Sequence, residues 1–440
     1  MLDLDRCREL IRDGAQPSYR GRIDRVSGVI VEATGVPSAL GEMCSIDRGS
    51  RGVIKAEVVG FRGASTLLMP HGELNGIAPQ QVVRSLGRTF SIDVGDELLG
   101  RVIDGFGRAL DGQPEVHTAT SRDVRQSAPD PLSRPSICEP LQTGVRSIDA
   151  MNTLGRGQRL GIFAGSGVGK SSLLAQITRG TDADVVVVSL VGERGREVRS
   201  FVDEVFGEEG RSKAVMVVAT SDRPPIERYM APFVAMTVAE HFRDQGKNVL
   251  VVMDSVTRFA AACREIGLAA GEPPTVRGYP PSFFATVPKL VERMGRTEKG
   301  SITGLLTILL DGDDPNEPVA DTLRGLLDGH IFLSRELAQA GHFPAVDVLA
   351  SLSRLMPSLS SPEHLARASQ LREWLSAWRD GKDLVEIGAY SEGSNAKLDQ
   401  AIMRMPVIEA FLKQLPTEDT PIEEALALLE LVTGDMSGGS

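Results

Sequence analysis

The sequence predicts an α/β fold whose centre is a mainly parallel sheet covered by helices on both faces. Three observations support this prediction. The middle third of the chain alternates apolar, β-rich runs with helical stretches, as buried parallel strands joined by crossover helices do. Short β-branched runs cut by glycines come before it, and purely helical patterns follow it. We therefore expect a small all-β module, an α/β core and a helical region, in that order.

Length and composition are those of an ordinary globular protein. The chain has 440 residues, 41% hydrophobic and 24% charged, which suggests roughly two to four domains. Its 48 Lys and Arg residues against 59 Asp and Glu give a net charge of −11, which disfavours a protein that works on nucleic acid or on anionic lipid. The four cysteines form no CxxC pair and are typical of reduced cytosolic thiols.

The N-terminal residues lack the pattern of a signal peptide, and the apolar stretches are only as long as strands. We therefore expect a cytoplasmic chain that neither carries a signal peptide nor spans a membrane. Residues 1–15 place apolar side chains at helical spacing between charges, from Leu4 to Ile11. This pattern predicts a short amphipathic helix that binds a partner, and a frayed terminus is the alternative.

Residues 16–85 are expected to form a small all-β domain, because they contain glycine-punctuated runs such as GRIDRVSGVIVEATG and SRGVIKAEVVGFRG. A second hairpin-like stretch, ELLGRVIDGFGRALDG, leads to a proline-rich connector at 129–140. The α/β core is expected over residues 86–358. Residues 359–440 show helical periodicity, with Trp374 and Trp378 four residues apart and most simply in the core.

The strongest chemical signal is AGSGVGKS, at 164–171, between an apolar strand and a helix. In this context glycines let backbone N–H groups converge on phosphate oxygens, and the helix N-terminus adds partial positive charge. Lys170 is expected to reach the β- and γ-phosphates, and Ser171 to bind Mg²⁺. The usual first glycine is replaced by Ala164, which fits if its φ is negative. The predicted binding residues for ATP are Gly165, Ser166, Gly167, Val168, Gly169, Lys170, Ser171 and Ser172.

Two carboxylates follow other apolar strands. Asp254 ends NVLVVMDS, where it can hold the hydration shell of Mg²⁺; the alternative is an Asp that caps the next helix. Glu193 follows DVVVVSLVG, where a carboxylate can polarise an attacking water; the alternative is a solvated surface charge. The six histidines show no metal-ligand spacing, so a transition-metal site is not expected.

Taken together, several motifs resemble those of the ATPases of type III protein export, which are related to the rotary ATP synthase catalytic subunit. The resemblance covers about residues 18–415 and is carried by AGSGVGKS, VGERGRE, MDSVTRF, GEPPTVRGYPPS, GDDPNEP and DGHIFLSRELAQAGHFPAVDVLASLSR. It implies a RecA-like P-loop ATPase core with an N-terminal β-barrel domain and a C-terminal α-helical domain, in a homohexameric ring around a central stalk protein. The stretches GVIVEATGVPSALGEMCSI and AEVVGFRGASTLLMP look like the flagellar branch; the virulence injectisome is the alternative.

The resemblance also implies roles for individual residues. Lys170, Ser171 and Asp254 would bind phosphate and Mg²⁺, Glu193 would activate water, and Arg194 would approach the γ-phosphate. These five residues would lie in one protomer.

Arg354, in LASLSR, matches an arginine finger inserted into the neighbouring subunit's site; a salt bridge at a domain junction is its alternative. Phe343 matches an aromatic that stacks on the adenine, usually Tyr, with a core phenylalanine as the alternative. Tyr390 would close the same pocket from the helical domain.

Partners are likewise implied by the resemblance. A stator-like regulator would bind the N-terminal segment, and the C-terminal helices would face the export gate and substrate–chaperone complexes. Membrane association would be peripheral at most, at the inner face of the plasma membrane.

The sequence disfavours two other functions. A non-catalytic ring subunit is disfavoured by Glu193, and an RNA-translocating hexamer by the few rings, Tyr19 and Phe61, in the all-β module. No specific nucleic acid partner is therefore expected.

Overall fold

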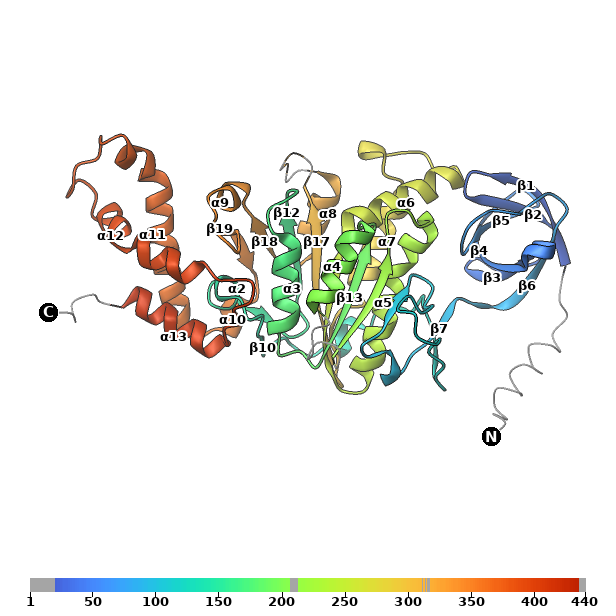
Figure 1. Cartoon of the computed structure of the whole chain (residues 1–440), viewed down its shortest axis with the longest axis horizontal. Coiled ribbons are helices and arrows are strands. Elements are labelled where there is room, and N and C mark those ends of the chain that lie inside the picture. Colours follow the sequence, from blue (N-terminus) through green and yellow to red (C-terminus); the bar gives the residue numbers. More distant parts are fainter. Residues whose placement is uncertain (1–19, 206–212, 311, 313, 315–316, 435–440) are drawn as a thin grey trace.

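The computed structural model describes residues 20–205, 213–310, 312, 314 and 317–434. A β-barrel, a central sheet with its helices and a group of C-terminal helices follow one another along the long axis of the molecule (Figure 1). The predicted fold class is thus confirmed. The amphipathic helix predicted at residues 1–15 lies outside the described residues, as does part of GDDPNEP. None of the described helices is both long and apolar enough to cross a bilayer.

The barrel is closed by six antiparallel strands in the order β1-β2-β5-β4-β3-β6. Their alternating residues point inward, and Ile23, Val31 and Leu68 are fully buried in its interior. Closure leaves no free strand edge. The strands are β1 (Arg20–Ser27), β2 (Ile30–Thr34), β3 (Glu42–Asp47), β4 (Val53–Arg62), β5 (Ser65–Pro70) and β6 (Val82–Thr89).

The central sheet has nine strands, eight of them in the order β19-β18-β12-β17-β15-β13-β14-β8, with β16 paired to β17. Neighbours are parallel except for β18–β19 and β16–β17. The strands are β8 (Val102–Asp104), β12 (Arg159–Ala164), β13 (Val185–Val191), β14 (Ala214–Ala219), β15 (Asn248–Asp254), β16 (Gly295–Arg296), β17 (Ser301–Leu309), β18 (Gly329–Leu333) and β19 (Val346–Ser353). Two small sheets pair β7 (Ser91–Asp93) with β9 (Ser121–Asp123) and β10 (Pro140–Leu141) with β11 (Leu154–Gly155).

Helices cover both faces of this sheet, as the continuous apolar strands predict. Every residue of β13 is buried, with Val187 packed on one face and Val188 on the other. One face carries α5 (Pro225–Asp244), α6 (Val256–Ala270), α7 (Pro281–Val291) and α8 (Pro318–Leu326). The other carries α2 (Arg146–Asp149), α3 (Lys170–Gly180) and α4 (Gly195–Val205). The short α9 (Arg335–Gln339) joins β18 to β19.

The C-terminal helices extend the second of these faces. They are α10 (Met356–Leu359), α11 (Pro362–Glu386), α12 (Ala396–Leu412) and α13 (Ile422–Thr433). Trp374 is buried in the same apolar cluster as α3, and Trp378 packs against that cluster. Both tryptophans therefore belong to the core, as their spacing indicates. The helical region is consequently continuous with the face of the sheet that carries α3.

A buried ion pair joins three segments on the face of the sheet that carries α5 and α7. Arg293 is only 1% exposed, and its guanidinium donates to both carboxylate oxygens of Glu240 on α5, at 2.8 and 2.7 Å. It also donates to the main-chain oxygen of Val124 at 2.9 Å and to Oγ1 of Thr237 at 3.2 Å. The charge is thus fully paired away from water, which makes the loss of one partner costly.

We predict that Arg293→Ala lowers the free energy of unfolding by about 3–5 kcal/mol, because Glu240 is left buried and unpaired. The double variant Arg293→Met with Glu240→Leu should recover most of this loss, since no charge is then stranded. Asp203→Ala is the control, because the side chains of Arg199 and Asp203 are 79% and 57% exposed and such pairs contribute less than about 1 kcal/mol. Denaturant unfolding measures all three, and equal losses for Arg293→Ala and the control would contradict the assignment.

Candidate functional site

The glycine-rich loop lies between β12 and α3, as predicted. Ala164 is the last residue of β12, so its backbone is extended. Gly167 and Gly169 have φ values of 79° and 87°, a region that side chains disfavour. Gly169 is the N-cap of α3, and Lys170 begins the helix. The glycines are therefore needed where the chain turns from the sheet into the helix.

The two predicted carboxylates meet the loop at the carboxyl edge of the sheet. Lys170 Nζ contacts Oδ1 of Asp254 at the end of β15 and lies 3.6 Å from Oε1 of Glu193, which follows β13. This meeting results from the strand order, because β17 and β15 lie between β12 and β13 and all four strands end at one edge. Sequence reasoning brought these three residues together correctly in space; their catalytic roles stay predictions.

Thr307 is a further member of this cluster that sequence reasoning missed. It lies on β17, between the strands that carry the loop and Asp254. Its hydroxyl donates to Oδ1 of Asp254 at 2.7 Å. Asp254 is only 3% exposed, so this hydrogen bond and the contact with Lys170 fix its carboxylate. A threonine near the carboxyl end of this buried strand was the available signal.

Burial raises the pKa of Glu193 above its ordinary value, and the negative charge of Asp254 and a hydrogen bond with Glu197 raise it further. The Lys170 ammonium opposes this shift. The Glu193 carboxylate is thus a better proton acceptor than a surface glutamate. Its environment is not that of the solvated charge considered as the alternative.

Arg194 lies at the surface and pairs with a neighbour of this cluster. Its side chain is 79% exposed, and Nη1 pairs with Oε1 of Glu197 at 3.0 Å. Its approach to a γ-phosphate stays a prediction. Arg354 is also exposed. Its guanidinium donates to the main-chain oxygen of Arg324 at 3.4 Å, and its main-chain N–H donates to the main-chain oxygen of Asp328 at 3.0 Å.

Phe343 lies directly over the glycine-rich loop. A β-carbon added at Gly169 would come within 3.2 Å of its ring, and the side chain is 41% exposed. Such an exposed ring disfavours the core alternative and leaves a face open for stacking. Tyr390, in contrast, is held within the helical region, where its hydroxyl hydrogen bonds with Asn395 O at 3.0 Å and with Asp399 Oδ1 at 2.8 Å.

Two more contacts to this part of the site were not predicted. Arg335, at the start of α9, donates from Nη1 to the main-chain oxygen of Ser166 at 3.2 Å. Gln414, after α12, donates its main-chain N–H to the oxygen of Phe343 at 2.9 Å. The helical region therefore reaches the site through Gln414, and the long sequence separation explains why no local pattern revealed it.

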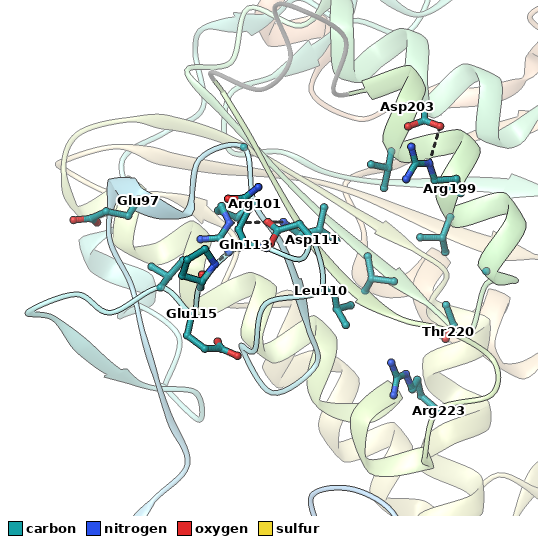
Figure 2. A pocket seen from close by; sticks show the side chains of 18 of the residues that line it. Glu97, Arg101, Leu110, Asp111, Gln113, Glu115, Arg199, Asp203, Thr220 and Arg223 are labelled. Carbon is teal, nitrogen blue, oxygen red and sulfur yellow. Dashed lines mark hydrogen bonds and ion pairs between the residues drawn. The ribbon is translucent and has the colours of Figure 1, made fainter.

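A cavity of about 960 Å³ lies between α4 and the segment after β8, apart from the cluster of Lys170 and Asp254. Figure 2 shows the Arg101–Asp111 and Arg199–Asp203 pairs on its walls. Lys170 and Asp254 do not line it. The buried residues of α4 are Phe201 and Val205. The helix begins two residues after Glu193, and its opposite flank, which includes Arg199 and Asp203, lines the cavity.

The fold and the lysine–carboxylate cluster together define a P-loop ATPase with a RecA-like core. Three family models match the chain: the nucleotide-binding domain of the ATP synthase alpha/beta family at 144–353, its beta-barrel domain at 23–87, and the T3SS EscN ATPase C-terminal domain at 360–430. The chain belongs to the family of flagellum-specific ATP synthases and type III secretion system ATPases.

Relatives from both branches match over nearly their full length. The flagellum-specific ATP synthase of Bacillus subtilis is 51% identical over 95% of this chain and 96% of its own. The type 3 secretion system ATPase of Xanthomonas euvesicatoria is 48% identical over 94% of each. The assembled ATPase EscN of enteropathogenic E. coli superposes with a TM-score of 0.89 at 43% identity, covering 94% of this chain and all of that one. A second structure, EscN with its central stalk EscO, covers the same shares with a TM-score of 0.87 at 42% identity.

We predict that Gly169→Ala weakens nucleotide binding and lowers the free energy of unfolding by about 1–2 kcal/mol, because the left-handed backbone is strained by a side chain. The added carbon would also press on the ring of Phe343.

The matched control is Gly325→Ala on α8, where an added carbon meets nothing within 4 Å. It should stabilise the protein by about 0.5–1 kcal/mol. Titration with a fluorescent ATP analogue and thermal unfolding measure both variants. Unchanged affinity in Gly169→Ala would show that the loop does not need this glycine.

Proposed function

We propose that this protein is an ATP hydrolase that powers or assists type III export of unfolded flagellar proteins, as a homohexameric ring around a central stalk. The observation that carries the proposal is the cluster of Lys170, Asp254 and Glu193 beside the glycine-rich loop. Membership of the export ATPase family supports both the reaction and the assembly.

The first step is binding of the triphosphate. The backbone of the glycine-rich loop and the N-terminus of α3 hold the phosphate oxygens. Lys170, which contacts Asp254 in the structure, turns to the β- and γ-phosphates. Phe343 presents its exposed face to the base.

Oxygen ligands suit Mg²⁺, and the fixed carboxylate of Asp254 and the hydroxyl of Ser171, in the first turn of α3, fit that role. When bound, the ion would neutralise charge on the phosphates. Release of Lys170 from Asp254 leaves this carboxylate free for the metal.

Hydrolysis then needs a water aligned with the γ-phosphate. Glu193 orients this water and accepts a proton from it as a general base, and the raised pKa of Glu193 favours this transfer. Arg194 leaves Glu197 to approach the same phosphate. The exposed Arg354 of the neighbouring protomer completes the site and spreads the charge that develops on the transferred group.

The remaining assignments follow from the same family. The expected division of the chain is a segment at 1–15, a barrel domain at 16–85, an ATPase domain at 86–358 and a helical domain at 359–440. We move the end of the barrel domain to residue 89, because β6 (Val82–Thr89) is one of the strands that close the barrel. The N-terminal segment binds a stator-like regulator, and the helical domain faces the export gate and substrate–chaperone complexes. The ring works in the cytoplasm, peripheral to the inner face of the plasma membrane.

The injectisome is the second candidate, because relatives of that branch match almost as closely as flagellar ones. Complementation of a strain that lacks its flagellar export ATPase distinguishes the branches. Restored motility supports the flagellar assignment, and failure by a stable, active protein favours the injectisome.

We predict that Glu193→Gln keeps ATP affinity and lowers the hydrolysis rate by about 10²–10⁴-fold, because the amide cannot accept the proton from water. Glu204→Gln, on the exposed side of α4, is the matched control and should hydrolyse ATP normally. Phosphate release and equilibrium nucleotide binding are measured on both. Hydrolysis by Glu193→Gln at the wild-type rate would remove Glu193 from the mechanism.

A second prediction concerns Arg354. Arg354→Ala should lower the rate by about 10³–10⁵-fold, while Arg367→Ala, which breaks a surface pair with Glu430, should leave the rate unchanged. The hydrolysis rate per protomer of the wild-type protein should rise with protein concentration, because the finger acts on a neighbour and assembly brings the two together.

Mixed rings test the same assignment. Arg354→Ala protomers mixed with Glu193→Gln protomers should regain activity, because some seams then combine an intact site with an intact finger. Full activity of demonstrably monomeric wild-type protein, or mixtures as inactive as the separate variants, would refute action across the seam.

A further inference from the structure

The helical region is attached to the ATPase core through the segment 413–420, which joins α12 to α13 and which we call the bridge segment. Gln176 on α3 donates to the main-chain oxygens of Leu415 at 3.3 Å and Glu418 at 2.9 Å. Arg179, also on α3, donates to that of Pro416 at 2.6 Å. The bridge segment is thus fastened along the helix that begins at the glycine-rich loop.

Gln414 is the residue of the bridge segment that binds Phe343. Its side chain is buried and fully hydrogen bonded. It is only 4% exposed. Its Oε1 accepts from the main-chain N–H of Arg146 at 2.9 Å, and its Nε2 donates to the oxygen of Gly144 at 2.7 Å. Nε2 also lies 3.1 Å from the oxygen of Glu418 and 3.2 Å from Oγ1 of Thr420. Both ends of the amide are satisfied, which fixes the side chain in one orientation.

The turn that receives this amide is itself rigid. The carboxylate of Asp149, fully buried, accepts from the main-chain N–H groups of Thr143 at 2.9 Å and Gly144 at 3.0 Å. It also accepts from the Thr143 hydroxyl at 2.7 Å. Gln414 is therefore anchored to a fixed part of the core and not to a mobile side chain.

From this anchored position the backbone of Gln414 reaches the nucleotide site. Its main-chain N–H donates to the oxygen of Phe343 at 2.9 Å, and the ring of Phe343 packs over Gly169, the residue before Lys170. A continuous series of contacts thus runs from the core turn through Gln414 and Phe343 to the glycine-rich loop.

We propose that Gln414 is a positioning residue that holds Phe343 over the glycine-rich loop and thereby sets the affinity for ATP. The inference rests on the proposed function, since it assumes that Phe343 stacks on the base. In this proposal the helical region shapes the pocket by placing Phe343 through a main-chain hydrogen bond; the expected contribution of Tyr390 stays a separate prediction.

The test is steady-state hydrolysis by Gln414→Ala. Loss of the anchor lets residue 414 move, so the ring of Phe343 is no longer held. We expect KM for ATP to rise about fivefold to tenfold, which corresponds to the free energy of one aromatic stacking contact. The value of kcat should stay within about twofold of wild type, because the carboxylate cluster is untouched.

Gln176→Ala is the matched control. It removes another buried glutamine that binds the bridge segment, and among the described residues its side chain makes no hydrogen bond with Phe343. Its KM should stay within about twofold of wild type. Equal increases for both variants would mean that general attachment of the segment matters, and would overturn the specific role of Gln414.

A double-mutant cycle with Phe343→Ala isolates the path. If Gln414 acts through Phe343, the double variant should have the same KM as Phe343→Ala alone. Additive increases in KM would refute the proposal. Thr420→Val serves if Gln414→Ala does not fold: it removes one acceptor of the amide and should raise KM by a smaller factor, again only while Phe343 is present.

The outcomes separate this inference from the proposed function. If the wild-type protein does not hydrolyse ATP, the proposed function fails. If it does and Phe343→Ala raises KM while neither Gln414→Ala nor Thr420→Val does, only the role of Gln414 is refuted. If Phe343→Ala itself leaves KM unchanged, the stacking assignment and the inference fail together, while hydrolysis stands.

Discussion

The contact between Lys170 and Asp254 is the interaction on which the geometry of the site depends. It joins the first turn of α3 to the end of β15 across the intervening β17, whose Thr307 binds the same carboxylate. Three strands must therefore end at one level for the cluster to form. Because a shift of register by one residue would turn each side chain to the opposite face, the parallel pairing of buried strands is also the constraint that holds these three side chains together.

The same sheet decides how the flanking regions are attached. The barrel packs through Ile30, Leu67 and Met69 into the apolar cluster of α5, α6 and α7, whereas the C-terminal helices share the cluster of α3. Each flanking region thus covers a different face. A change in the helical region can act on α3 and the glycine-rich loop directly, while a change in the barrel reaches them only through the sheet.

Local patterns in the sequence were enough to predict the loop, the two carboxylates and the layers. Each of these features depends on residues close together in the chain: a strand, a turn and a helix start. The sequence did not reveal that β8, part of an apparent hairpin, pairs with β14 in the central sheet, or that Gln414 binds the turn at Gly144 and Arg146. Such contacts join segments far apart in the chain and leave no periodic signature.

The charges around the loop leave a role for a cation from a second protomer in the proposed mechanism. Lys170 faces the two carboxylates of Asp254 and Glu193, and these three groups together carry a formal charge of −1 before a polyanionic triphosphate arrives. Arg335 adds a cation at the loop itself, where it donates to the main-chain oxygen of Ser166. The nearby Arg194 is engaged on the surface with Glu197, and Arg354 lies exposed at the end of β19, outside the cluster. Charge that develops on the γ-phosphate during hydrolysis is stabilised by further cations placed next to it. In the proposed ring, Arg354 of the neighbouring protomer supplies one such cation at each seam, so that assembly would be part of the chemistry and not only of the architecture.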